Sequence, residues 1–172
     1  MEDNIIGYDL NTPAKDGMDN ITTALRELLN KYPSLGINDE ITFQVLDATT
    51  GKAMFPTSSV AIIQEVEDVT EHVTQTCIYS FLVVYRASGL NENKKANVKE
   101  WLDNLGRWLQ KETISINGTD YKLKSYPTLT SNREFTKIAR TSQSYLYNTT
   151  EDKSEDWAIS IQATYTNEFD RD

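Results

Sequence analysis

Few side chains in this sequence are able to do covalent or metal chemistry, because it contains one histidine, His72, and one cysteine, Cys77. Zinc centres are built from several histidine or cysteine ligands, so a site of that kind is excluded. A nucleophilic triad would have to use His72, and we expect an ordinary, partly exposed histidine instead. Cys77 lies inside an apolar stretch, which favours a buried small side chain over a reactive thiol.

Carboxylates gather in two places along the chain. The acidic side chains of the two clusters are Glu65, Glu67, Asp68 and Glu71, and Glu151, Asp152, Glu155 and Asp156. Paired carboxylates can hold a divalent cation or act as the acid and base of a glycosidase. Both clusters fall in predicted turns, which favours solvated loops, and the second lacks the glycine-centred order of an EF-hand loop. A metal-dependent hydrolase that uses these turn carboxylates remains an alternative.

The composition argues against several classes of function. The net charge is −9, with 26 acidic against 17 basic residues, and this opposes wrapping around nucleic acid, which needs many Lys and Arg contacts to phosphate. None of the glycine patterns that cradle nucleotide phosphates occurs among the seven glycines. No run approaches the ~18 apolar residues of a membrane span, and the first residues lack the features of a signal peptide. We therefore expect a chain that is made in the cytoplasm and has no membrane contact.

The apolar pattern predicts a single domain over residues 18–172, preceded by a flexible arm over residues 1–17. The central element of this domain is the stretch 72–86, where β-branched and aromatic residues recur with a period of two. Its first half has one apolar face, whereas its second half is apolar on both faces. This pattern is typical of a central strand that is covered on both sides at its far end.

Two helices are expected to pack on the sheet that this strand organises. The first is capped at Asp19 or Asn20 and ends before Pro33. The second is capped at Asn91 or Asn93 and ends near residue 111. Each helix carries its apolar side chains on one stripe, which predicts that this stripe faces the core.

Six further strands are predicted, at residues 40–46, 59–66, 114–116, 121–123, 138–147 and 157–167, with a long loop over residues 47–59. The strand at 59–66 is expected to form an antiparallel hairpin with the central strand, and Asn117 and Gly118 turn a second hairpin. The strand at 138–147 is polar on both faces, which indicates an edge strand or one wetted on both sides. An open edge of this length favours aggregation unless another chain covers it, which is a first indication of assembly. The predicted fold class is α+β, with a mixed, mainly antiparallel sheet that carries the two helices.

The C-terminal part of the sequence has a distinctive order of features. A Ser/Thr-rich strand ends in Tyr145-Leu146-Tyr147, an acidic hairpin tip follows, and the last strand reads W-x-I-x-I-x-A-x-Y. The front half adds a leading helix (ITTALRELLNKYPSL) and a long strand followed by a helix with two tryptophans (VKEWLDNLGRWLQ). Over residues 18–167 this pattern resembles the tail-terminator family of long-tailed bacteriophages of Gram-positive hosts, also labelled tail-completion or minor capsid proteins.

The resemblance implies a structural virion protein with no enzymatic activity and no cofactor. It implies a ring, usually a hexamer, that caps the tail tube protein, ends tube polymerisation and joins the tail to the connector or stopper protein of the neck. DNA would pass through the ring without specific binding, which suits an acidic chain. Another neck component, such as a stopper or head-completion protein, is the alternative within this class. A small binding module is the alternative outside it.

The edge strand and the acidic turns supply the candidate residues for such a ring. Candidates for the contact between subunits are Ile138, Arg140, Ser142, Ser144, Tyr145 and Tyr147. Candidates for a surface that faces the lumen or a partner ring are Glu151, Asp152, Glu155, Asp156, Glu65, Glu67 and Asp68. The sequence leaves open which of the two acidic turns lines the lumen.

Overall fold

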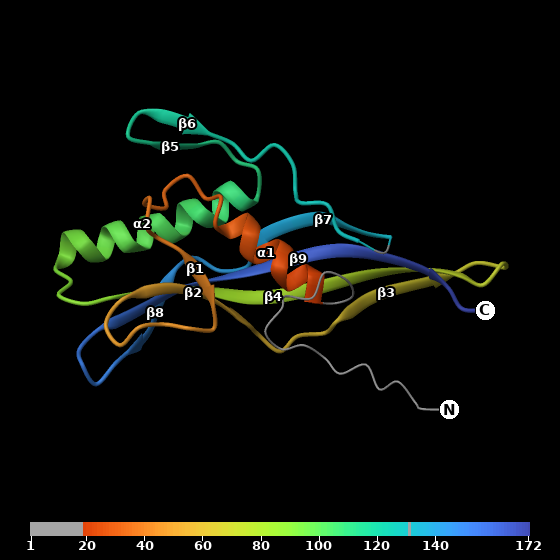
Figure 1. Ribbon diagram of the computed structural model, residues 1–172, viewed down its shortest axis with the longest axis horizontal. Coiled ribbons are helices and arrows are strands. Elements are labelled where there is room, and N and C mark those ends of the chain that lie inside the picture. The colour runs from red at the N-terminus through yellow and green to blue at the C-terminus, as the bar shows by residue number, and fades with distance from the viewer. Residues whose placement is uncertain (1–18, 131) are drawn as a thin grey trace, which may run out of the picture.

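The computed structural model describes residues 19–130 and 132–172, so the predicted arm over residues 1–17 lies outside the described residues. Within them the fold is α+β, and two helices accompany a mixed, mainly antiparallel sheet, as predicted (Figure 1). In chain order the elements are α1 (Asp19–Leu29), β1 (Ile41–Phe43), β2 (Gly51–Pro56), β3 (Ile62–Glu67), β4 (His72–Ala87), α2 (Glu92–Leu109), β5 (Ile114–Ile116), β6 (Thr119–Tyr121), β7 (Arg133–Arg140), β8 (Tyr145–Thr149) and β9 (Glu155–Asp170).

Two long strands form the middle of the sheet. β4 and β9 have 16 residues each and pair antiparallel, from His72 opposite Asp170 to Ala87 opposite Glu155. β2 and β3 pair with successive parts of β4, whereas β7 and β8 pair with successive parts of β9. β1 adds to β2 in parallel. β3 therefore lies at one edge of the sheet, and β7 and β8 lie at the opposite edge.

The residue pattern of β4 explains its place in the middle. Its first half buries alternate residues on one face, Cys77 among them, as predicted. Between residues 81 and 84 every side chain is buried. Leu82 and Val84 point away from the helices and pack against Leu46 and Phe55, so the far end of the strand is covered on both sides. This confirms the expectation from the apolar pattern.

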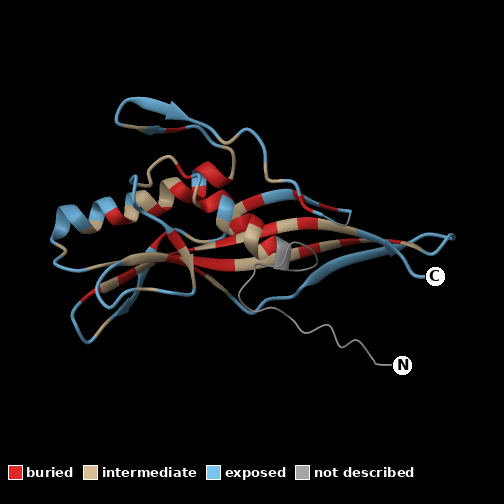
Figure 2. Cartoon of the chain, in the orientation of Figure 1, coloured by how far each residue is buried: buried red, intermediate tan, exposed pale blue. Residues whose placement is uncertain are grey.

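Both helices lie over the same face of the sheet, and their inward-facing sides are buried (Figure 2). The cap of α2 is Asn91, whose side chain accepts a hydrogen bond from the backbone N–H of Lys94 at 3.0 Å. Its stripe buries Leu102, Leu105 and Leu109 in the core. α1 begins at Asp19 and stops at Leu29, before the expected end. Neither of these helices is long and apolar enough to cross a membrane.

Two predictions for the first half of the chain were wrong. The strand expected at residues 40–46 is limited to β1, because Gln44 has a φ of 55° and leaves the extended conformation. The loop expected at residues 47–59 contains β2, which pairs with β4 from Gly51 to Pro56 and buries Ala53 and Met54. The glycine and proline lie at the two ends of this strand, where they interrupt its ladder least.

The strand expected at residues 138–147 is divided into β7 and β8. Helix α2 causes the division, because Ser144 donates its backbone N–H to the Asp103 carboxylate at 2.9 Å and its hydroxyl to the Lys99 carbonyl at 3.0 Å. Both parts remain edge strands that pair with β9, as the polar pattern predicted. The hairpin β5–β6 also agrees with prediction, since Asn117 and Gly118 have φ values of 51° and 81°.

Phe81→Ala is expected to lower the free energy of unfolding by about 3–5 kcal/mol, because it leaves a cavity in the core of the sheet. Phe81 is 1% exposed, whereas Phe169 at the end of β9 is 36% exposed. The control variant Phe169→Ala removes the same atoms and is expected to cost less than about 1.5 kcal/mol. Urea unfolding of both variants measures the difference, and equal losses would contradict the central position of Phe81.

Candidate functional site

The second acidic cluster is divided by the fold into structural and exposed carboxylates. Asp156 is buried and accepts two hydrogen bonds from Arg86 on β4, at 2.7 Å from Nε and 2.9 Å from Nη2. Arg86 also donates to the Asp47 carbonyl at 3.0 Å. The hydrogen bond to Asp156 raises the pKa of the Arg86 guanidinium. This bidentate pair links β9 to β4 and, through Asp47, to the connection between β1 and β2, and it holds Asp156 inside the subunit.

Glu155 is also engaged within the subunit. Its carboxylate pairs with Lys95 of α2 at 2.9 Å and accepts from Trp157 Nε1 at 3.2 Å. The hydrogen bond from Lys95 lowers the pKa of Glu155, and the bond from Trp157 adds to that effect. Glu151 and Asp152 lie exposed in the turn between β8 and β9. Of the four carboxylates in this cluster, these two are open to solvent.

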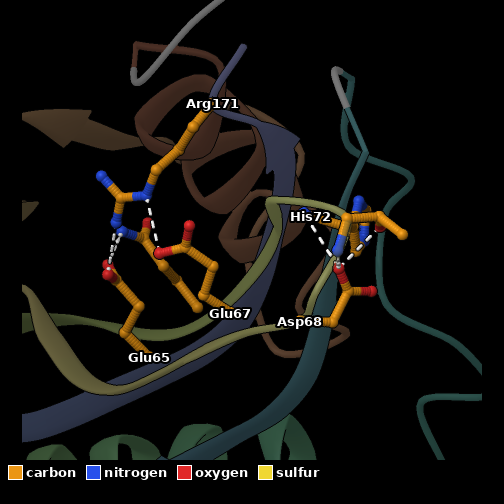
Figure 3. Close-up of polar contacts among 7 residues, drawn as sticks. Glu65, Glu67, Asp68, His72 and Arg171 are labelled. Carbon is orange, nitrogen blue, oxygen red and sulfur yellow. Dashed lines mark hydrogen bonds and ion pairs between the residues drawn. The ribbon is translucent and has the colours of Figure 1, made fainter.

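The first acidic cluster lies where β3 and β4 meet the C-terminal end of β9 (Figure 3). Arg171 pairs with Glu65 at 2.6 Å and with Glu67 at 3.1 Å, and Gln75 donates to Glu65 at 2.7 Å. All three side chains of these ion pairs are more than a third exposed, so each pair adds at most about 1 kcal/mol. The pairs attach the C-terminal residues to the hairpin that β3 and β4 form.

Asp68 holds the turn of this hairpin. Its carboxylate accepts from the Thr70 hydroxyl at 2.6 Å, the Thr70 N–H at 2.8 Å and the His72 N–H at 3.2 Å. The Thr70 hydroxyl is the largest cause of a lowered pKa at Asp68. His72 in turn contacts Asp170, with 2.8 Å between Nδ1 and Oδ1, and this hydrogen bond raises the pKa of the imidazole. These contacts order the turn and engage both the backbone N–H and the ring of His72, whose side chain stays 39% exposed.

The described residues contain no group of three or more His, Cys, Asp or Glu side chains placed to hold a metal ion. The fold keeps the two acidic clusters apart, and most of their carboxylates contact an arginine, a lysine or a backbone N–H. Most of the carboxylates in the two clusters therefore act as ion-pair or hydrogen-bond partners within the subunit.

The candidate subunit-contact residues divide in the same way. Ile138 is 0% exposed and Ser144 is 4% exposed, so both belong to the core of the subunit. Arg140 and Ser142 border a pocket of about 620 Å³ between α2 and the connection from β7 to β8. Tyr145 and Tyr147 project from β8 with 38% and 54% of their surface exposed. The accessible part of this set is therefore β8 and the segment just before it.

The structure also exposes apolar side chains that sequence reasoning missed. On β3 and in the turn that follows, Ile62, Ile63, Val66 and Val69 are exposed, and Leu146 is exposed on β8. β3 pairs with β4 alone among the described strands, and β8 pairs with β9 alone. The sequence held a signal, because the stretch AIIQEV has apolar residues at both alternating positions.

A half-buried lysine was also missed. Lys52 of β2 lies over the rings of Tyr85 at 4.2 Å and Trp101 at 5.4 Å, and it forms an ion pair with Asp39. A pocket of about 390 Å³ opens beside it. The carboxylate and the two ring faces satisfy this cation, and the contacts attach β2 to α2. No local sequence pattern predicts these contacts of Lys52, because the residue lies in a stretch that is predicted to be a loop.

A scan of the chain against models of known protein families finds no family that matches. A search among curated proteins finds no relative either.

Asp156→Ala is expected to destabilise the protein by about 2–3 kcal/mol. The loss is below the ~3–5 kcal/mol of a fully buried pair, because the Arg86 side chain keeps 19% exposure and can recruit water. The matched control Asp152→Ala, in the exposed turn, is expected to change stability by less than about 0.5 kcal/mol. Urea unfolding distinguishes them, and a silent Asp156 variant would contradict the structural role of the pair.

The pKa of His72 is expected to lie above the ordinary value of 6.5, chiefly because of the hydrogen bond with Asp170. Because the folded protein binds the proton more tightly, the stabilisation is complete below about pH 6.5 and is lost as the pH rises through the raised pKa. The chain has one histidine, so an NMR titration of the tag-free protein reports this pKa directly. The variant Asp170→Asn should lower the pKa of His72. A pKa at or below 6.5 in the wild type would contradict the contact.

Proposed function

We propose that this protein is a tail-terminator subunit of a long-tailed bacteriophage, which forms a ring, usually a hexamer, on the last ring of the tail tube. The observation that carries the proposal is that one sheet presents two unlike open edges, β3 on the side of β4 and β8 on the side of β9. A contact between unlike surfaces is heterologous, and repetition of such a contact gives a ring where the successive rotations add up to a full turn. This geometry adds to the order of elements that the sequence shares with the family.

The charge of the chain supports passage of DNA through such a ring. The net charge is −9, and Glu151 and Asp152 extend from an exposed turn. A lumen lined with like charge keeps DNA from binding to the wall. Glu65, Glu67 and Asp68 are accessible as well, so both turns stay candidates for the lumen or for a partner ring. Glu155 and Asp156 are engaged within the subunit and are not proposed for that role.

The partners of the ring would be the tail tube protein on one side and the connector or stopper protein on the other. In this role the protein needs no catalytic group or cofactor, and it would be made in the host cytoplasm and reside in the virion at the junction of head and tail. Several carboxylates are paired with arginine or lysine side chains within the subunit, and this suits a protein whose function depends on surface contacts.

The proposal predicts a closed ring at one end of tail tubes assembled from the tube protein of the same phage. Light scattering on the purified chain, alone and mixed with these tubes, gives the mass, and electron microscopy of the tube ends shows the position of the ring. A chain that stays monomeric and ignores the tubes would contradict the proposal. Binding to portal or connector rings in place of tubes would support the stopper alternative.

A further inference from the structure

We propose that the subunits of this ring join by pairing the edge strand β3 of one copy, antiparallel, with the edge strand β8 of the next. The inference rests on the proposed ring for its setting, but its evidence is the chemistry of the two edges. β3 and β8 have six and five residues and are exposed along their whole length. Matched lengths and open backbone groups on both strands permit continuous hydrogen bonding across the joint.

Both edges carry apolar side chains that a free subunit would leave in water. On β3 these are Ile62, Ile63 and Val66, and on β8 they are Tyr145, Leu146 and Tyr147. Open strand edges with apolar side chains promote association unless charge or a bulge protects them. β3 has a register irregularity at Ile63 and β8 has one at Tyr147, yet both strands continue beyond it. A second copy would cover both apolar surfaces in one contact.

The charges of the two edges are complementary. Residues 60–71 carry four carboxylates and no lysine or arginine, and Arg171, which pairs with Glu65 and Glu67, offsets one of these four charges. Arg107 of α2 and Arg140 at the end of β7 border the pocket of about 620 Å³, which is also lined by Asp103, itself paired with Lys99. Arg107 has an exposed partner, Glu112, at 3.4 Å, and among the described residues no salt bridge involves Arg140. An acidic strand and a pocket with two arginines favour contact between copies of a chain whose net charge is negative.

Charge also selects the antiparallel direction. In that orientation the acidic end of β3, near Glu67, lies beside the start of β8, where Arg140 is close. The apolar start of β3 then lies toward Thr149. In the parallel orientation Glu67 would approach the β8–β9 turn, which carries Glu151 and Asp152. Like charges placed directly opposite one another destabilise a strand pair, so the parallel joint is disfavoured.

Engineered cysteines test the contact and its direction. The variant Val66→Cys with Tyr145→Cys is expected to form a disulfide-linked ladder of subunits under mild oxidation, in concentrated solution or on tail tubes. The variant Val66→Cys with Thr149→Cys reports the parallel arrangement and is expected to stay uncrosslinked. The native Cys77 is buried, so the wild type is the control for background reaction. Two variants that each carry one engineered cysteine, at Val66 or at Tyr145, should yield only dimers when they are mixed, because the joint is heterologous.

A second variant tests the edge without new cysteines. Val66→Lys places a charge on the β3 edge and is expected to weaken assembly by more than about tenfold in the concentration needed for half-assembly. Val45→Lys is the matched control, because Val45 is 65% exposed, close to the 56% of Val66, and lies outside both edges. Both variants should keep the circular dichroism and melting temperature of the wild type. Assembly of Val66→Lys at the wild-type concentration would overturn the inference.

The outcomes separate this inference from the proposed function. Rings that cap tubes without the Val66–Tyr145 crosslink, or with the Val66–Thr149 crosslink, would overturn the β3–β8 joint and leave the function in place. Ladders with the Val66–Tyr145 crosslink from a protein that never caps tubes would support the joint and contradict the terminator role. Absence of both crosslinks on tubes and in concentrated solution would overturn the joint.

Discussion

The antiparallel pairing of β4 with β9 is the interaction on which the rest of the structure depends. It runs over all 16 residues of both strands, and β2, β3, β7 and β8 each add to one of the two. Because the pair is longer than its neighbours, each side of it accommodates two short strands in succession. The helices cover the apolar face of its middle, where Phe81 and Ile161 are buried. The position of each edge strand in the sheet follows from this arrangement.

Pairs of charged side chains hold the two ends of the β4–β9 pair, where apolar side chains no longer cover the sheet. At one end Arg86 and Asp156 bridge the two strands through a buried bidentate contact. At the other end His72 and Asp170 face each other across the strands, and Arg171 extends to the glutamates of β3. The acidic residues that looked most like a site are thus largely occupied in closing the fold. Glu151 and Asp152 stay open to solvent, as do the outer backbone edges of β3 and β8 with their apolar side chains.

The two edges of the sheet differ in chemistry, and this difference gives the proposed assembly its direction. β3 is apolar and acidic, whereas β8 is aromatic and follows a connection whose pocket is lined by Arg107 and Arg140 as well as Asp103. An edge that matched itself would favour a two-fold dimer, whereas in the proposed assembly the two unlike edges pair with each other. A contact of that kind requires each subunit to use both edges, one toward each neighbour, which is the condition for a ring.

The sequence by itself determined the elements whose signals are local. The alternation in β4 and β9 and the turn at Asn117 and Gly118 need only neighbouring residues to be recognised, because burial on one face repeats with the period of the element and the turn depends on adjacent residues. The cap of α2 was narrowed in the same way to Asn91 or Asn93. The α+β class and the polar edge strand followed from these patterns. Local patterns also indicated that both faces of β4 are covered at its far end.

Only the tertiary structure decided which short stretches pair and which carboxylates are free. β2 exists because β4 lies beside it, and β7 separates from β8 because Asp103 and Lys99 of α2 bind Ser144. Asp156 is occupied because Arg86, 70 residues away, meets it across the sheet. The apolar side chains of β3 would be predicted to be buried from their neighbours along the chain, whereas the fold leaves them exposed. Exposure and pairing are properties of residues distant in sequence, so no local signal could fix them.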